Sequence, residues 1–122
     1  MTIRIAINGF GRIGRNIFRA ACKDPLFGDV DIVAINDLTD NATLAHLLKY
    51  DSIIGPFGGE VQSDEHGIWV DGRHITVTSH RSPANIPWGN MGVEYVAECT
   101  GLCQDGQSAH GHLDAGAHKV VI

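Results

Sequence analysis

The sequence predicts an α/β fold in which helices cover both faces of a mostly parallel sheet. Segments typical of strands alternate with segments typical of helices along most of the chain, and this alternation indicates βαβ units. The segment Asp31–Asp37 (DIVAIND) is a continuous apolar run. Such a run favours a strand that is buried on both faces of a parallel sheet.

The first third of the chain predicts two repeats of a strand followed by a helix. Residues 2–8 (TIRIAIN) place isoleucines at alternate positions, which indicates a strand. Apolar residues then recur at helical spacing from Arg12 to about Cys22. After the buried strand, residues 38–50 (LTDNATLAHLLKY) predict a second helix, with Asp40 or Asn41 able to cap it.

The middle of the chain predicts an inserted β-hairpin. The Asp71-Gly72 pair separates two β-prone runs within residues 67–79, which is a strong hairpin signal. A loop at 53–59 and a short strand at 60–62 are expected before it. The rest of the chain predicts, in order, a loop at 80–92, a strand at 93–101, a helix at 104–116 and a strand at 117–122.

Composition narrows the class of protein. The net charge of −5 argues against nucleic acid as a main partner, because that binding needs clustered Lys and Arg. No apolar run approaches the ~18 residues of a membrane span, and the N-terminus lacks the pattern of a signal peptide. The three cysteines are expected to be free thiols in a reducing compartment, so the expected location is the cytoplasm.

A glycine-rich loop follows the first predicted strand and opens the first predicted helix. Its glycines, Gly9, Gly11 and Gly14, have the spacing G-x-G-x-x-G. In this context the motif predicts a dinucleotide site: the first glycine permits a tight turn, the second lets a pyrophosphate approach and the third lets the helix pack on the strand. The N–H groups of Gly11, Arg12 and Ile13 would meet the phosphates at the positive end of the helix.

An acidic residue completes this pattern. Asp37 lies at the end of the second predicted strand, near the expected distance of ~20 residues from the motif. Its carboxylate can accept hydrogen bonds from the adenosine ribose and would repel a 2′-phosphate, so NAD is favoured over NADP. Arg12 would weaken this preference if it reached the ribose. The alternative is that the glycines form only a turn and Asp37 caps the following helix.

A third group of residues, Cys99, Thr100 and Gly101, ends a later predicted strand. Ligands of open α/β sheets bind at the carboxyl ends of strands, which places these residues beside the cofactor, on its nicotinamide side. No catalytic residue is predicted, because no base or cation is placed to activate Cys99. No metal site is predicted either, and the seven histidines are expected to be exposed or singly hydrogen-bonded.

Five segments resemble one enzyme family, the phosphorylating glyceraldehyde-3-phosphate dehydrogenases, in the right order along nearly the whole chain. They are INGFGRIGR, AINDLTD, LAHLLKYDSIIG, IPWG and ECTG. The resemblance implies a Rossmann-type, doubly wound NAD-binding domain spanning residues 1–122, truncated at its C-terminal end and incomplete without the catalytic domain. Cys99 departs from the family's usual serine, and Cys103 stands where an aromatic residue is common.

The resemblance also implies which residues hold NAD. They are Asn8, Gly9, Phe10, Gly11, Arg12, Ile13 and Gly14 around the pyrophosphate, Asn36 and Asp37 at the adenosine, Arg81 through its backbone near the adenine, and Cys99, Thr100 and Gly101 in the later turn.

The family's reaction is expected of the intact parent. That enzyme, a cytoplasmic homotetramer, oxidises a small phosphorylated aldehyde through a cysteine, passes hydride to NAD and transfers the acyl group to phosphate. The family's Ser-Cys-Thr-Thr-Asn-Cys motif does not occur here, so the segment alone is expected to bind NAD and to be inactive. Two alternatives are erythrose-4-phosphate dehydrogenase, whose family typically carries Glu at the position of Asp37, and a stand-alone nucleotide-binding or interaction module.

Overall fold

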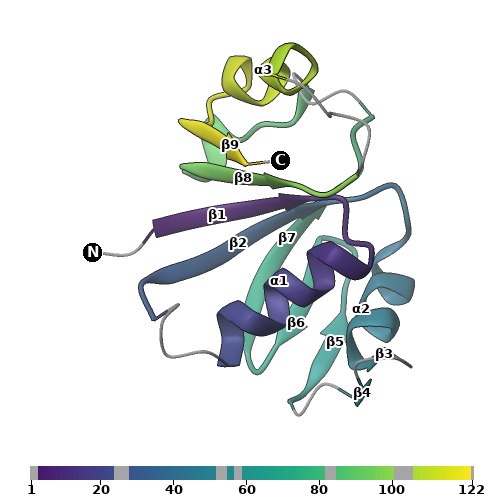
Figure 1. Cartoon of the computed structure of the whole chain (residues 1–122). Coiled ribbons are helices and arrows are strands. Elements are labelled where there is room, and N and C mark those ends of the chain that lie inside the picture. The colour runs from purple at the N-terminus through teal and green to yellow at the C-terminus, as the bar shows by residue number, and fades with distance from the viewer. Residues whose placement is uncertain are drawn as a thin grey trace.

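A seven-stranded sheet runs through the protein in the order β5-β6-β7-β2-β1-β8-β9 (Figure 1). The computed structural model describes residues 3–23, 28–51, 55–56, 59–81, 85–100 and 106–121. The strands of this sheet are β1 (Ile3–Asn8), β2 (Val30–Asn36), β5 (Val61–Ser63), β6 (Gly67–Val70), β7 (Arg73–Thr78), β8 (Tyr95–Glu98) and β9 (Lys119–Val121). The helices are α1 (Arg12–Lys23), α2 (Asn41–Lys49) and α3 (Gly106–Asp114), with a short 3-10 helix, η3 (Gly89–Met91).

The centre of the sheet is parallel. Strands β7, β2, β1, β8 and β9 are joined side by side in parallel pairs. β1 lies between β2 and β8, so the order in which successive strands are added to the sheet reverses at β1. In open α/β sheets this switch point is where ligands bind, outside the carboxyl ends of the strands.

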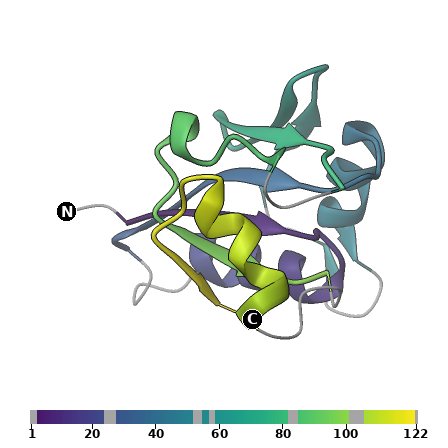
Figure 2. The ribbon, with the colours of Figure 1, turned by 90° about the horizontal axis from the view of Figure 1, so that it is seen from above.

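Both faces of the sheet are buried, as the apolar run in β2 predicted. Neighbouring residues of a strand point to opposite faces. Ile7 and Ile35 therefore join the core under α1 and α2, whereas Ala6 and Ala34 join a second core around Trp88. Figure 1 shows α1 in front of the sheet, and in Figure 2 α3 lies over the edge formed by β8 and β9. This arrangement confirms the doubly wound fold class.

Local signals also place α2 and the hairpin as predicted. Asp40 caps α2, where its side chain accepts a hydrogen bond from the Thr43 N–H at 2.8 Å. The hairpin β6–β7 turns at Asp71 and Gly72, whose φ angles of 50° and 83° are both positive. Two positive φ angles match the right-handed twist of the strands, which explains the Asp-Gly pair.

Three boundaries differ from the sequence prediction. β2 ends one residue before Asp37, whose side chain instead accepts a hydrogen bond from the Phe10 N–H of the glycine loop. β8 covers only Tyr95–Glu98 of the strand expected at 93–101. Within the expected loop at 53–59, β4 (Gly55–Pro56) pairs with β3 (Tyr50–Asp51).

Two expected features of the later turn, Gly101 and Cys103, lie outside the described residues. Among the described helices, none is both long and apolar enough to span a membrane.

Candidate dinucleotide-binding site

A cleft of about 470 Å³ opens at the carboxyl ends of β1, β2 and β8, at the switch point of the sheet. Its walls bring together eight residues of the predicted site and two, Leu38 and His80, that were not predicted. The lining residues are Asn8, Gly9, Gly11, Asn36, Asp37, Leu38, His80, Arg81, Cys99 and Thr100.

The three motif glycines meet three different surroundings. Gly9 has a φ of +91°, and a Cβ there would come within 2.7 Å of the Thr100 Cγ2. A Cβ on Gly14 would lie 2.4 Å from the Gly9 carbonyl oxygen, so only glycine lets α1 pack this closely on the loop. A Cβ on Gly11 would meet no protein atom within 4 Å. Gly9 and Gly14 therefore serve the predicted turn and helix packing, and Gly11 faces open space in the cleft.

The carboxylate of Asp37 ties the second strand to the glycine loop. The Phe10 N–H donates to Asp37 Oδ2 at 2.7 Å, and the Thr39 N–H donates to Oδ1 at 2.9 Å. An ionised carboxylate can accept about four hydrogen bonds. Asp37 thus retains capacity to accept hydroxyl groups of a ligand while it holds the loop in place.

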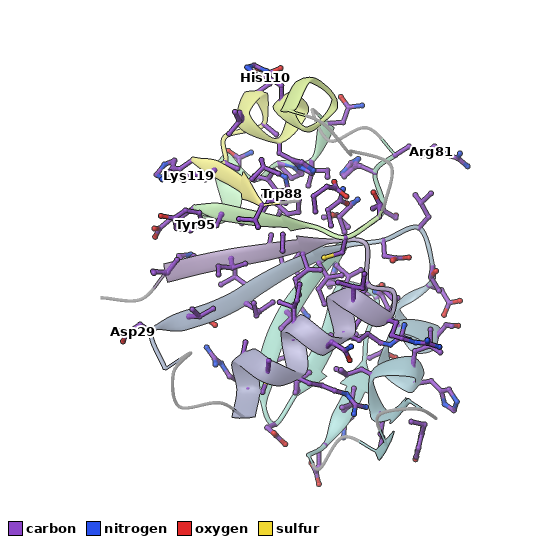
Figure 3. The ribbon with its side chains drawn as sticks, viewed as in Figure 1. Asp29, Arg81, Trp88, Tyr95, His110 and Lys119 are labelled. Atoms are coloured by element: carbon purple, nitrogen blue, oxygen red, sulfur yellow. The ribbon has the colours of Figure 1, made fainter. Side chains whose placement is uncertain are left out.

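Phe10, Arg12 and Ile13 lie around the cleft without forming its walls, whereas Arg81 is part of a wall. The Phe10 side chain is buried in the core, edge-on to Phe18 with ring centroids 5.9 Å apart, so only its backbone faces the loop. Arg12 and Ile13 are exposed on the first turn of α1. Arg81 follows β7, and its side chain extends away from the sheet (Figure 3).

A row of polar side chains crosses four parallel strands, and two of its members, Asn8 and Asn36, also line the cleft. Asn8, the last residue of β1, lies in register with Asn36 of β2 and with Glu98 of β8, and Asn36 lies in register with Thr78 of β7. Asn36 Nδ2 donates to Asn8 Oδ1 at 2.8 Å, and Asn8 Nδ2 donates to Glu98 Oε1 at 2.6 Å. Thr78 Oγ1 donates to Asn36 Oδ1 at 2.7 Å. We call these four side chains, together with His112 and Trp88, the polar ladder.

Glu98 is the point where this ladder meets the turn after β8. Its Oε2 accepts hydrogen bonds from Thr100 Oγ1 at 2.6 Å and from the Thr100 N–H at 2.9 Å. Its Oε1 lies 2.7 Å from His112 Nε2, and both side chains are fully buried. Glu98 therefore accepts from Asn8, His112 and Thr100 at once.

The tautomer of His112 follows from its other neighbour. Trp88 Nε1, which can only donate, lies 2.9 Å from His112 Nδ1, so Nδ1 is the acceptor of that bond. The neutral ring then carries its proton on Nε2 and donates to Glu98. Figure 3 shows Trp88 directed inward near β8 and β9.

The surroundings of Glu98 favour its ionised form. Burial alone would raise the pKa of this carboxyl group, but the hydrogen bonds from His112, Thr100 and Asn8 outweigh burial and lower the pKa to about 2. A fixed negative charge therefore lies directly beneath the wall of the cleft.

The half-buried thiol of Cys99 lies in that wall, next to Glu98. Burial raises its pKa, and the negative charge of Glu98 raises the pKa further. A thiol that stays protonated is a weak nucleophile. Its environment therefore fits a residue that lines the cleft better than one that attacks a substrate.

Sequence reasoning missed part of this arrangement. His112 was expected to be exposed or singly hydrogen-bonded, but it is buried with a partner on each ring nitrogen. That expectation was wrong because the packing of α3 over β8 brings together residues far apart in sequence. Glu98 had a usable signal: it ends a buried strand with a polar residue, as Asn8 and Asn36 do.

Comparison with known proteins decides the family. Residues 3–106 match the model described as glyceraldehyde 3-phosphate dehydrogenase, NAD binding domain. The chain belongs to this family. The cofactor of the domain is therefore NAD, as the glycine motif and Asp37 predicted.

Relatives over the full length of the chain are also glyceraldehyde-3-phosphate dehydrogenases. The NAD-binding domain is 51% identical over 122 residues to the protein of Geobacillus stearothermophilus and 54% identical over 122 residues to that of Streptomyces coelicolor. The protein of Kitasatospora aureofaciens is 53% identical over 119 residues, or 98% of this chain. The domain spans 36%, 36% and 35% of the lengths of these three relatives.

Proposed function

We propose that the cleft binds NAD across the switch point of the sheet and that the domain serves the phosphorylating oxidation of glyceraldehyde 3-phosphate. The observation that carries the proposal is the position of Asp37 and Gly11 in one cleft. One offers a carboxylate with free acceptor capacity, and the other leaves open space beside the start of a helix. These are the two features that a ribose and a pyrophosphate need.

The start of α1 supports the pyrophosphate part of this proposal. The first turn of a helix has N–H groups without intrahelical partners, and the helix dipole makes this end positive. The first turn of α1 contains no acidic residue that would oppose an anion. The Phe10 N–H is already bound by Asp37. The N–H groups of Gly11, Arg12 and Ile13 then remain for the phosphates.

Two groups of predicted residues would hold the two ends of the cofactor. Asp37, Asn36 and the backbone of Arg81 would hold the adenosine end. Cys99, Thr100 and Gly101 would face the nicotinamide end, and Asn8 and Gly9 would lie around the pyrophosphate between the two ends. When bound, NAD supplies a hydride acceptor, and the role of these residues is to fix its position and shield it from water.

The activity of the whole protein is part of the proposal, because the chain spans about a third of its relatives. Glyceraldehyde 3-phosphate, phosphate and NAD would be converted to 1,3-bisphosphoglycerate and NADH in glycolysis. We propose that the intact enzyme is a homotetramer in the cytoplasm, as the family resemblance implies. Sedimentation of the purified protein checks the tetramer.

Calorimetry with NAD and NADP tests the binding. We expect NAD to bind at least tenfold more tightly than NADP, because Asp37 would repel a 2′-phosphate. No binding at millimolar NAD would contradict the proposal. Because Cys99 is held protonated, we expect this chain to bind NAD without reducing it. Aldehyde- and phosphate-dependent formation of NADH by the chain would contradict cofactor binding as its only role.

A further inference from the structure

Glu98 lies outside the cleft walls but holds a residue that forms one of them. Its side chain is fully buried, and both hydrogen-bond donors of Thr100, the N–H and the hydroxyl, donate to the same oxygen, Oε2. Thr100 in turn packs against Gly9, where a Cβ would approach within 2.7 Å. The position of Thr100 therefore sets how the turn after β8 meets the glycine loop.

The hydrogen bonds between side chains of the polar ladder run toward this one carboxylate. On one side, Trp88 donates to His112 and His112 donates to Glu98. On the other side, Asn36 donates to Asn8 and Asn8 donates to Glu98. An ionised carboxylate is an acceptor at both oxygens, so it matches this pattern completely. A neutral amide of the same shape has one accepting oxygen and cannot match it.

We propose that Glu98 is a positioning residue for NAD: its carboxylate fixes Thr100 in the wall that faces the nicotinamide end of the cofactor. This inference rests on the proposed function. The ladder holds Glu98 from below through His112 and Asn8, and Glu98 holds Thr100 above. The cleft wall is then ordered before the cofactor arrives, which lowers the entropic cost of binding.

The substitution Glu98→Gln separates the bonds that Glu98 accepts from Asn8 and His112 from the bonds that it accepts from Thr100. With its oxygen toward Asn8 and His112, the amide keeps both buried bonds, and its NH₂ group faces the Thr100 N–H. Two donors then meet, so the hold on the Thr100 backbone is lost while the ladder below stays intact. The opposite orientation would bring the NH₂ group against two buried donors and is therefore disfavoured.

Binding of NAD and of AMP distinguishes positioning from a general structural role. AMP carries adenosine, whose site Asp37 and Asn36 would form, and one phosphate, but it has no nicotinamide. We expect Glu98→Gln to weaken NAD binding about tenfold, as loss of a charge-assisted hydrogen bond implies, and to change AMP binding less than twofold. Equal weakening of both ligands, or unchanged NAD binding, would overturn the inference.

Two further variants complete the calorimetric experiment. Thr100→Val removes the hydroxyl that donates to Glu98 Oε2. If the two residues act together, the double variant Glu98→Gln/Thr100→Val should lose less NAD affinity than the two single fold-losses multiplied. Independent, multiplying effects would show that Thr100 acts without Glu98. If Glu98→Gln fails to fold, Thr100→Val alone decides: NAD binding should weaken several-fold with AMP binding unchanged, and no selective loss of NAD binding would overturn the inference.

Ile68→Val is the matched control for lost stability. Ile68 is fully buried in the core under α1 and α2, the one that contains Ile7 and Ile35, and it does not line the cleft. We expect Ile68→Val to have a lower melting temperature and unchanged NAD binding. If Ile68→Val also bound NAD more weakly, the effect of Glu98→Gln would be explained by lost stability, and the inference would be overturned. If the unaltered chain binds NAD, the proposed function stands whatever the variants do. If it does not bind NAD, the proposed function and the inference both fall.

Discussion

The Phe10 N–H donates a hydrogen bond of 2.7 Å to the Asp37 carboxylate, across a separation of 27 residues in sequence. This bond joins the glycine loop to the end of β2. The residue proposed to recognise the ribose therefore also fixes the loop proposed to hold the pyrophosphate. Recognition of the two groups is coupled through one carboxylate.

Substitution of Asp37 by Asn tests this coupling. The amide has one accepting oxygen, so it cannot serve the Phe10 N–H, the Thr39 N–H and two ribose hydroxyls together. We expect Asp37→Asn to weaken NAD binding by 10-fold or more and to reduce the preference for NAD over NADP, since the repelling charge is gone. Titration calorimetry with both dinucleotides measures the two effects.

Asp40→Asn provides the matched control for this substitution. Asp40 caps α2 three residues away and is not part of the cleft wall. Because Asn is also a good N-cap residue, the variant should keep both the melting temperature and the affinity for NAD. A loss of NAD binding in this control equal to that in Asp37→Asn would contradict a specific role for Asp37.

Substitution of Gly14 and of Gly11 by Ala should have separate effects, the first on the stability of the fold and the second on NAD binding. A Cβ on Gly14 would lie 2.4 Å from the Gly9 carbonyl oxygen, so Gly14→Ala should lower the free energy of unfolding by about 1–3 kcal/mol, as overpacking does. Gly11→Ala meets no protein atom within 4 Å and should leave the melting temperature nearly unchanged. Its methyl group would nevertheless occupy the space proposed for the pyrophosphate, so NAD binding should fall.

Thermal melts and NAD titrations of the two glycine variants give a direct comparison. The expected pattern is reduced stability for Gly14→Ala and reduced affinity with normal stability for Gly11→Ala. If Gly11→Ala bound NAD normally, the pyrophosphate would not lie against this part of the loop.

The features predicted from sequence are those that a short stretch of chain encodes. Gly9, Gly11 and Gly14 lie within six residues of each other, and the turn at Asp71 and Gly72 depends only on local φ angles. Such signals do not require knowledge of the rest of the fold. They were sufficient to predict the hairpin and a dinucleotide site after the first strand, and the alternation of strand and helix patterns was sufficient to predict the parallel sheet.

The features that the sequence did not reveal depend on packing between distant elements. His112 contacts Glu98 and Trp88 only because α3 and the segment before η3 are folded over the same face of the sheet. His80 reaches the cleft because Asn36 binds its backbone N–H and carbonyl oxygen at 2.9 Å each. A histidine in either position carries no local pattern that distinguishes it from an exposed one.

The pKa of Glu98 predicts how stability depends on pH. Hydrogen bonding outweighs burial and lowers this pKa from 4.5 to about 2, so the folded state holds the proton less tightly than the unfolded state. The unfolded state therefore binds more protons between pH 4.5 and pH 2, and stability rises with pH across this window. The contribution of Glu98 should be complete above pH 4.5 and be lost on acidification toward pH 2.

Urea unfolding of the unaltered chain and of Glu98→Gln, between pH 2 and pH 7, measures this contribution. Glutamine does not titrate, so the variant should lose less stability on acidification. A residual slope should remain, because the hydrogen bonds from Trp69 and His66 lower the pKa of the exposed Asp64 to about 2 as well. Parallel pH profiles for the two proteins would show that Glu98 is not held ionised by Thr100, His112 and Asn8. A flatter profile for Glu98→Gln would locate the acid sensitivity of the fold directly beneath the cofactor cleft.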